Sequence, residues 1–426
     1  MRILHTADLH LGQIIYRHYD RADEHAHFFR QLNDIIARHK PDALVVSGDI
    51  FDVQQPSATA MKAFNGYFAA LRRTFPELQI VVVAGNHDSA SRLHSHTEVW
   101  ELSGVRLVGT PPPLNFAETD GWQERYVLRI PQGFIITLPY MTGNRPEVGV
   151  ALQEYVAAMN TEGLPVVMTG HLAVSGSDVE GHDINIGTLN SLPLERLGSG
   201  YDYLALGHIH KPQTLTHIAG QNAEYAMEPT EHPAPVARYS GSPIHISGDE
   251  AYPHSVSLVD VDSHGGNVTI NRIRINQLRH FHIIPDSPEA ITSEKDALKL
   301  LKKFIDTHSG AYIRFKLSTT ADISPNFDTK VYDLIENCDK DIRYNPNTLW
   351  VSPVQDDDEA EAVSAATFEV SELQQMANPL EFVQRTIDRY PSLSDINLEE
   401  AFAEIEDEIR RMDEEAQSKT RKTASR

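Results

Sequence analysis

The most constraining feature of this sequence is a pattern that occurs five times: a short apolar run, a small residue or glycine, and then Asp, Asn or His. The run at residues 43–46 shows no polar alternation, which is typical of a strand covered on both faces. Gly48 ends this run and Asp49 follows it, at the strand end where ligands usually sit in layered α/β proteins. We therefore expect a layered α/β fold whose polar site is built at strand ends.

The other four occurrences supply more side chains of the same kind. Apolar runs at residues 3–6, 80–84, 166–169 and 203–206 each lead into Asp, Asn or His. A single Asp after a strand usually caps a helix or forms a turn, but five occurrences favour a shared site. Carboxylate, amide and imidazole ligands without a thiolate suit manganese, iron or zinc better than magnesium or calcium. The candidate metal ligands are Asp8, His10, Asp49, Asn86, His171, His208 and His210.

In chain order the motifs are D-x-H, GDxxD, GNHD, GH and GHIH, and this set resembles the calcineurin-like metallophosphoesterase superfamily. Longer blocks are similar to the SbcD family, the nuclease subunits of bacterial SbcCD complexes. These blocks are the opening MRILHTADLHLG, SGDIFD, VVVAGNHDS, and YSGSP at residues 239–243. The resemblance implies a four-layer αββα metallophosphoesterase sandwich that holds two divalent metal ions, expected to be Mn²⁺.

The resemblance also assigns the ligands to two ions, with Asp49 bridging both. It implies that Asp8, His10 and His210 complete one site, and that Asn86, His171 and His208 complete the other. Two cations placed close together lower the barrier to phosphodiester cleavage by neutralising the phosphate and activating water. We therefore expect a dinuclear phosphodiesterase.

His87 and Asp52 are the predicted catalytic residues that do not bind metal. Because adjacent side chains diverge, His87 should face the leaving group if Asn86 faces the metals. A histidine there can protonate the departing oxygen as a general acid. We expect the Asp52 carboxylate to orient the His87 ring, as carboxylates behind functional histidines often do.

Three functions are compatible with these residues. The first, which the resemblance to the SbcD family implies, is a nuclease that cleaves double-stranded and hairpin DNA, as a 3′–5′ exonuclease and an endonuclease, in DNA repair, recombination and replication. The second is a phosphodiesterase or phosphatase acting on small nucleotides or phosphoproteins. The third is a scaffold without catalysis, which the complete ligand set argues against. The extra segments that follow the motifs favour the nuclease, because a minimal phosphoesterase needs neither of them.

Length and cysteine content limit the organisation and the compartment. A chain of 426 residues exceeds what one hydrophobic core usually organises, so two or more domains are expected. Cys338 is the single cysteine, which fits a reducing compartment. No apolar run approaches the roughly 20 residues needed to span a bilayer. The first residues enter a predicted strand at once. We expect a cytoplasmic protein that does not insert into membranes.

The net charge of -23 argues against tight DNA binding by this chain alone, because Lys and Arg normally supply most of the affinity for phosphates. Residues from Gln355 onward contribute 19 acidic and 8 basic side chains to this balance. A partner that supplies basic surface is therefore expected. The resemblance points the same way, since it implies an SbcC-like coiled-coil ATPase as partner, with DNA as the substrate.

The pattern of strands, helices and charge predicts five segments. They are a metallophosphoesterase domain at 1–276, a small α+β domain at 277–352, an acidic linker at 353–377, a helical segment at 378–417 and a disordered tail at 418–426. The resemblance implies that the small α+β domain is a capping domain over the active site. The helical segment carries an apolar stripe at spacings of 3 and 4, formed by Leu398, Phe402, Ile405, Ile409 and Met412. Such a stripe most often packs on its own domain. The resemblance instead implies that it binds the ATPase partner.

Several local expectations concern the first domain. A helix that begins after Ser57 and one helix at 90–102 should pack on the sheet, and the resemblance suggests that both build a homodimer contact. A helix at 153–159 and a surface loop at 111–123 are also predicted. Four further histidines lack the strand and glycine context, so we expect them to be exposed or hydrogen-bonded rather than ligands. They are His217, His232, His245 and His254.

Overall fold

The computed structural model describes residues 1–143, 145–179, 191–215 and 229–352. Met1–Pro353 form one compact unit. The predicted linker, helical segment and tail, residues 353–426, lie outside the described residues, as does His217. The mixed α/β class expected from the sequence is confirmed.

The first sheet has seven strands and carries three of the five motifs. In spatial order its strands are β12 (Thr230–Pro233), β15 (Asn267–Arg274), β14 (Ser255–Val261), β1 (Arg2–Thr6), β4 (Ala43–Ser47), β5 (Gln79–Val83) and β6 (Val105–Val108). Neighbouring strands from β1 to β6 run parallel. Since parallel strands are covered on both faces, the apolar runs of β4 and β5 need no polar alternation.

The second sheet has six strands and carries the other two motifs. Its strands, in spatial order, are β11 (Gln213–Leu215), β13 (Val236–Tyr239), β10 (Tyr203–Gly207), β9 (Val166–His171), β8 (Gly133–Leu138) and β7 (Val127–Ile130). Strands β8, β9 and β10 are parallel neighbours, so the residues that follow β9 and β10 lie at one edge. The Ser47 hydroxyl lies 2.8 Å from the Thr169 hydroxyl, which ties the two sheets together near that edge.

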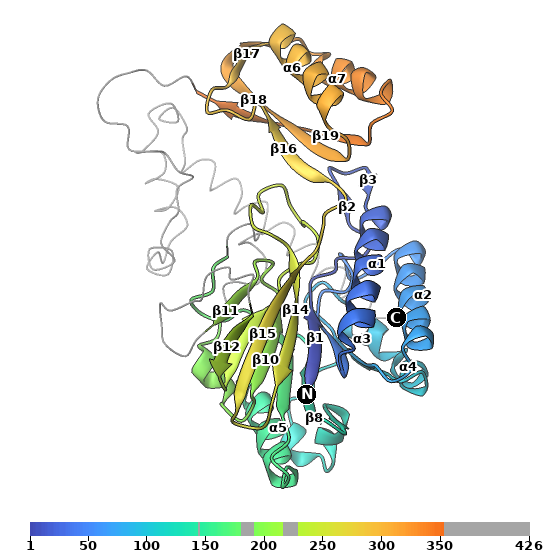
Figure 1. The fold of residues 1–426 in the computed structure, drawn as a ribbon, viewed down its shortest axis with the longest axis vertical. Helices are drawn as coiled ribbons and strands as arrows, with labels where there is room; N and C mark the ends of the chain where they lie inside the picture. The colour runs from blue at the N-terminus through green and yellow to red at the C-terminus, as the bar shows by residue number, and fades with distance from the viewer. Residues whose placement is uncertain (144, 180–190, 216–228, 353–426) are drawn as a thin grey trace, which may run out of the picture. The chain divides into compact units, whose positions relative to one another are not determined.

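Three hydrophobic cores separate these layers. The first lies between the first sheet and helices α1 (Ala22–His39), α2 (Ala58–Thr74), α3 (Ala90–His94) and α4 (Thr97–Leu102). The second lies between the sheets, where Val45 and Val81 meet Val167 and Ala205. The third lies between the second sheet and α5 (Pro146–Met159). Helices, sheet, sheet and helix therefore follow one another, as expected from the sequence. Figure 1 shows α1 to α4 together on one side of the sheets.

Three local predictions need correction. The single helix expected at 90–102 is two helices, α3 and α4, because the chain leaves the helix at His96 and the Thr97 hydroxyl donates to Leu107 O in β6. Helix α5 begins at Pro146, earlier than predicted, since a proline in the first helical turn has no N–H to leave unpaired. The loop expected at 111–123 contains two short 3₁₀ helices, Phe116–Glu118 and Trp122–Arg125.

Residues 277–352 form a small sheet with two helices and a core of their own. The elements are β16 (His280–Ile284), β17 (Ile291–Ser293), α6 (Glu294–Thr307), β18 (Ala311–Asp322), α7 (Phe327–Glu336) and β19 (Ile342–Val351). Strands β16, β17 and β19 all pair with β18 in parallel. Ser293 is the N-cap of α6, because its Oγ accepts a hydrogen bond from Asp296 N at 3.2 Å.

A buried ionic cluster ties this small domain to the start of α1. The Glu24 carboxylate accepts hydrogen bonds from Arg21 Nε at 2.7 Å, Arg279 Nη1 at 2.9 Å and the Tyr312 hydroxyl at 2.5 Å. Arg279 also pairs with Asp23. We call these five residues the Glu24 joint. Arg21 and Glu24 lie at the start of α1, and Arg279 and Tyr312 lie within residues 277–352, so the joint links two separate hydrophobic cores of one compact unit.

Candidate metal centre

The five motifs meet at the carboxyl ends of β1, β4, β5, β9 and β10. The loops after β1 and β4 are joined by backbone hydrogen bonds, from Asp8 N to Gly48 O at 3.0 Å and from His10 N to Asp49 O at 3.1 Å. Because three strands belong to one sheet and two to the other, the site lies at the edge where the sheets face each other. The structure brings all seven predicted ligand side chains together there.

One part of the site is organised around Asn86. Its Oδ1 lies 2.9 Å from His171 Nε2 and 3.0 Å from His208 Nδ1. The His171 ring is held from behind by Ser47, whose carbonyl lies 2.9 Å from His171 Nδ1. With Nδ1 so engaged, Nε2 is the nitrogen that points into the site. The three side chains thus present one amide oxygen and two imidazoles at a common point.

The other part is organised around Asp8 and His10. The ligand-type atoms of Asp8, His10 and His210 all lie within 4.8 Å of one another, and the same is true of Asp8, Asp49 and His171. Asp49 Oδ2 lies 3.3 Å from His171 Nε2 and 3.9 Å from His10 Nε2. The Asp49 carboxylate therefore reaches both parts of the site.

The two central carboxylates are oriented by backbone groups from other loops. Asp8 Oδ1 accepts a hydrogen bond from His208 N at 2.9 Å, and Asp49 Oδ1 accepts one from His87 N at 2.9 Å. Each carboxylate uses one oxygen to receive a neighbouring loop and directs the other inward. These bonds hold the loop after β10 to the loop after β1, and the loop after β5 to the loop after β4.

The backbone at the site adopts a conformation that most residues avoid. Asp8, His10, Asp49 and His208 have φ values of 54°, 46°, 48° and 103°. Non-glycine residues rarely have positive φ, and those that do cluster at functional sites. Space is equally restricted, since a Cβ atom on Gly85 would lie 2.1 Å from Asp49 Oδ1. This glycine is needed so that the loop after β5 can approach the Asp49 carboxylate.

The chemistry of the site fits divalent cations. Asp8 Oδ2 and His10 Nε2 are buried and have no hydrogen-bond partner among the described residues. Buried polar atoms are nearly always hydrogen-bonded, so unpaired ones of this type require an explanation. Carboxylate oxygens and imidazole nitrogens converging without thiolates are typical ligands of manganese, iron or zinc. A pair of divalent ions would give these atoms their partners.

Charge coupling within the site is strong. Burial disfavours the charged form of Asp49, but the nearby His171 and His10 outweigh it and hold the pKa of Asp49 well below its usual range. Burial likewise opposes the charge on His171, yet Asp49 and Asp8 raise its pKa to about 9. The carboxylates and the histidines of the site therefore each favour the charged form of the other. A bound cation would take over this favourable interaction with the carboxylates.

The predicted catalytic pair lies at the same edge, but one contact differs from the expectation. His87 Nδ1 lies 2.7 Å from the backbone carbonyl of Asp52, so the Asp52 main chain orients the ring. The Asp52 carboxylate instead lies 3.3 Å from His10 Nδ1. The expectation that this carboxylate orients His87 is therefore wrong, because the turn after β4 directs it toward the first motif.

Sequence reasoning missed two features near the site. Asp88, the last residue of GNHD, accepts backbone hydrogen bonds from Ile50, Phe51 and Gly85 at 2.8–3.1 Å, so it fixes two of the loops to each other. Glu250 lies behind the site, 3.3 Å from His210 Nδ1. The spacing GNHD could have signalled Asp88, whereas Glu250 follows no strand and carried no signal.

The chain is similar to curated nucleases over most of its length. Residues 1–212 match the calcineurin-like phosphoesterase family. SbcD of the SbcCD nuclease from Escherichia coli strain K12 is 30% identical over 318 residues, which cover 69% of this chain and 73% of that protein. The chain belongs to the SbcD family. SbcD of Rhodobacter capsulatus is 32% identical over 287 residues, covering 61% of this chain and 66% of that protein. SbcD of Bacillus subtilis is 29% identical over 276 residues, again covering 61% and 66%.

Membership of the SbcD family confirms the predicted enzyme class. This SbcD-family chain is a metallophosphoesterase of nuclease type, and its buried Asp and His clusters are consistent with divalent metal ions. Among the described residues, no helix is both long and apolar enough to cross a membrane.

Proposed function

We propose that this SbcD-family chain is a manganese-dependent nuclease that cleaves double-stranded and hairpin DNA, as a 3′–5′ exonuclease and an endonuclease, in DNA repair and recombination. The observation that supports the proposal is the convergence of seven ligand-type side chains from five strand ends. A site with unpaired buried carboxylate and imidazole atoms suits phosphodiester chemistry, in which negative charge must be neutralised.

In this proposal Asp49 is shared between two ions. Asp8, His10 and His210 hold one ion, and Asn86, His171 and His208 hold the other. When bound, the two ions supply charge neutralisation at the phosphate and an activated water. Because Asn86 is a neutral ligand, it adds an oxygen without adding negative charge to the site. The backbone ties to the Asp8 and Asp49 carboxylates keep these ligands in place before the substrate arrives.

His87 is proposed to protonate the leaving oxygen. Its Nδ1 is held by the Asp52 carbonyl, so its Nε2 is the nitrogen available to carry a proton to the substrate. The ring lies beside the ligand His10, with 5.0 Å between their centroids, which places it close enough to serve a phosphate held there. A general acid in this position contributes to turnover and not to metal binding.

DNA binding is proposed to need a partner. The formal net charge of -23 disfavours tight DNA binding by this chain alone. An SbcC-like coiled-coil ATPase would supply the basic surface that binds DNA. The predicted helical segment at 378–417 is the proposed binding element for it, and residues 277–352 are the proposed capping domain that selects DNA. We also propose a homodimer through α2 and the segment at 90–102, which forms α3 and α4; within α4, Leu102 is 91% exposed and Val99 is 65% exposed.

The proposal is tested with the purified full chain on labelled duplex and hairpin DNA. We expect cleavage with Mn²⁺, no cleavage with a chelator, and faster cleavage when the coiled-coil ATPase and ATP are added. Cyclic nucleotides and a phosphopeptide serve as competing substrates. Hydrolysis of these with no cleavage of DNA, in the presence or absence of the ATPase, would contradict the nuclease proposal. Asp substitutions at Phe402 and Ile405 should abolish the stimulation by the ATPase but leave metal-dependent cleavage unchanged.

A further inference from the structure

One buried carboxylate behind the metal centre has no role in the proposed reaction. Glu250 is 4% exposed and lies in the segment between β13 and β14. Its Oε1 lies 3.3 Å from His210 Nδ1, within ion-pair distance, and this buried oxygen accepts no hydrogen bond from the described residues. We propose that Glu250 is a positioning residue that accepts the Nδ1 proton of His210 and so directs His210 Nε2 toward the metal. This inference rests on the proposed function of the site, because it assigns His210 as a ligand.

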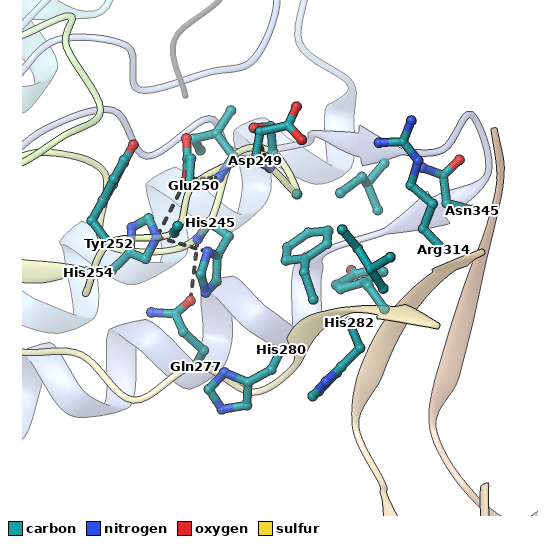
Figure 2. A pocket seen from close by; sticks show the side chains of 18 of the residues that line it. His245, Asp249, Glu250, Tyr252, His254, Gln277, His280, His282, Arg314 and Asn345 are labelled. Atoms are coloured by element: carbon teal, nitrogen blue, oxygen red, sulfur yellow. Dashed lines mark hydrogen bonds and ion pairs between the residues drawn. The ribbon is translucent and has the colours of Figure 1, made fainter. Parts of the chain in front are cut away.

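The second oxygen of Glu250 shows that the carboxylate is fixed in place. Glu250 Oε2 accepts a hydrogen bond from Ile246 N at 2.9 Å and lies 3.5 Å from His254 Nε2. His254 is itself held, since its Nδ1 lies 2.8 Å from Ser242 O and its Nε2 lies 2.9 Å from His245 Nδ1. Figure 2 shows Glu250 next to His254, with His245 beyond it. One oxygen is thus anchored to its own loop, and the other is left to face His210.

The cavity beside Glu250 explains why His210 needs an acceptor that is held in a fixed orientation. Glu250 and His254 also line a cavity of about 800 Å³, bounded on its far side by Arg314 and Asn345 of the small domain (Figure 2). Water in that cavity could compete for a loosely held imidazole. A buried acceptor that is already oriented selects one tautomer and one ring orientation of His210. Carboxylates that hold metal-binding histidines in this way typically affect metal affinity by roughly 10- to 100-fold.

The same geometry allows one competing assignment. The ligand-type atoms of His245, Glu250 and His254 lie within 4.8 Å of one another, so these three side chains could themselves hold a cation. The hydrogen bonds just described already engage His254 Nδ1 and Glu250 Oε2, and they account for the cluster without an ion. The two assignments differ in the number of ions bound and in the site that a Glu250 substitution weakens.

The test measures Mn²⁺ binding to the full chain by calorimetry and by the electron paramagnetic resonance of bound manganese. Glu250→Met keeps the unbranched shape and removes the acceptor, whereas Glu250→Gln keeps an acceptor without the charge. We expect Glu250→Met to weaken one of two sites by about 10- to 100-fold, with a smaller loss for Glu250→Gln. Excess Mn²⁺ should restore cleavage. Asp249→Asn, an exposed neighbour in the same loop, should bind Mn²⁺ like the wild type.

A double-mutant cycle with His210→Ala separates positioning from a general structural effect. If Glu250 acts through His210, adding Glu250→Met to His210→Ala should produce little further loss of Mn²⁺ affinity. Urea unfolding of each variant checks that the fold persists. Affinity within twofold of wild type for Glu250→Met, or additive losses in the double variant, would overturn the proposal. So would a third bound ion that disappears with His245→Ala.

These outcomes are distinguishable from failure of the proposed function. If the wild type binds no Mn²⁺, or if His210→Ala binds both ions normally, the metal centre itself is wrong. If the wild type binds two ions and His210→Ala weakens one, but Glu250→Met does not, only the role of Glu250 is wrong.

Discussion

The metal centre and the Glu24 joint are both buried and charged, but they differ in how their central carboxylates are satisfied. In the joint, the Glu24 carboxylate takes hydrogen bonds from Arg21, Arg279 and Tyr312. In the metal centre, Asp8 Oδ2 and His10 Nε2 take none from the part of the chain that the structure describes. A cluster that satisfies its own central carboxylate connects parts of the fold. A cluster that leaves inward-facing atoms unpaired is a place where a ligand binds.

The largest effect is expected when Asp49, the carboxylate proposed to be shared by both ions, is replaced. Asp49→Asn should lower the Mn²⁺-dependent cleavage rate by roughly 10³-fold or more, because stabilisation of developing charge is usually the largest catalytic contribution. Metal content measured by mass spectrometry should fall with it. Asp34→Asn, on the exposed face of α1, is the matched control and should keep both. Full metal content in Asp49→Asn would show that the carboxylate is not a ligand.

The next largest effect is expected when the central carboxylate of the Glu24 joint is removed. Glu24→Ala leaves Arg21 and Arg279 buried without their shared carboxylate, so it should lower the free energy of unfolding by about 3 kcal/mol in urea. Asp260→Asn, which removes the partner of Arg2 in an exposed pair, should cost less than about 1 kcal/mol. Metal content under native conditions should be unchanged in both variants. Equal losses of unfolding free energy in Glu24→Ala and Asp260→Asn would mean that the buried joint stabilises the fold no more than an exposed ion pair does.

A smaller effect separates catalysis from metal binding inside the centre. His87→Ala should slow turnover by roughly 10²-fold, the lower end of what a general acid contributes, and should keep the wild-type metal content. Single-turnover cleavage and metal analysis on one preparation measure both quantities. His27→Ala, a substitution on α1 away from the site, is the control. Loss of metal and turnover together would refute the assignment of His87.

The smallest effect concerns the pH dependence of the joint. Burial opposes the charge on Glu24, but Arg21, Tyr312 and Arg279 outweigh it and lower its pKa from the ordinary value of 4.5. A carboxyl with a lowered folded-state pKa adds stability above its unfolded pKa and loses it as the pH falls through the folded value. The wild type should therefore lose more stability than Glu24→Gln when urea unfolding is repeated at decreasing pH below 4.5. Parallel curves would contradict this.

The sequence predicted the metal centre better than the joint, for a physical reason. Each ligand follows a strand and a small residue, so one local pattern reveals both the side chain and the edge to which it belongs. Arg21 is a local partner of Glu24, but the other two, Arg279 and Tyr312, lie hundreds of positions away, and no local pattern connects them to it. The sequence predicted correctly that Asp52 lies at the edge of the sheets that holds the site. It did not predict that the Asp52 carboxylate faces His10, because the direction of a side chain in a turn depends on tertiary contacts.

The left-handed backbone at Asp8, His10, Asp49 and His208 has a consequence for how substitutions at these positions are interpreted. Glycine adopts positive φ more readily than other residues, so replacing one of these four by glycine removes the side chain and relaxes the backbone, whereas replacing it by alanine removes the side chain and keeps the strain. Comparing the two replacements at one position therefore separates the loss of a side chain from the cost of the backbone conformation.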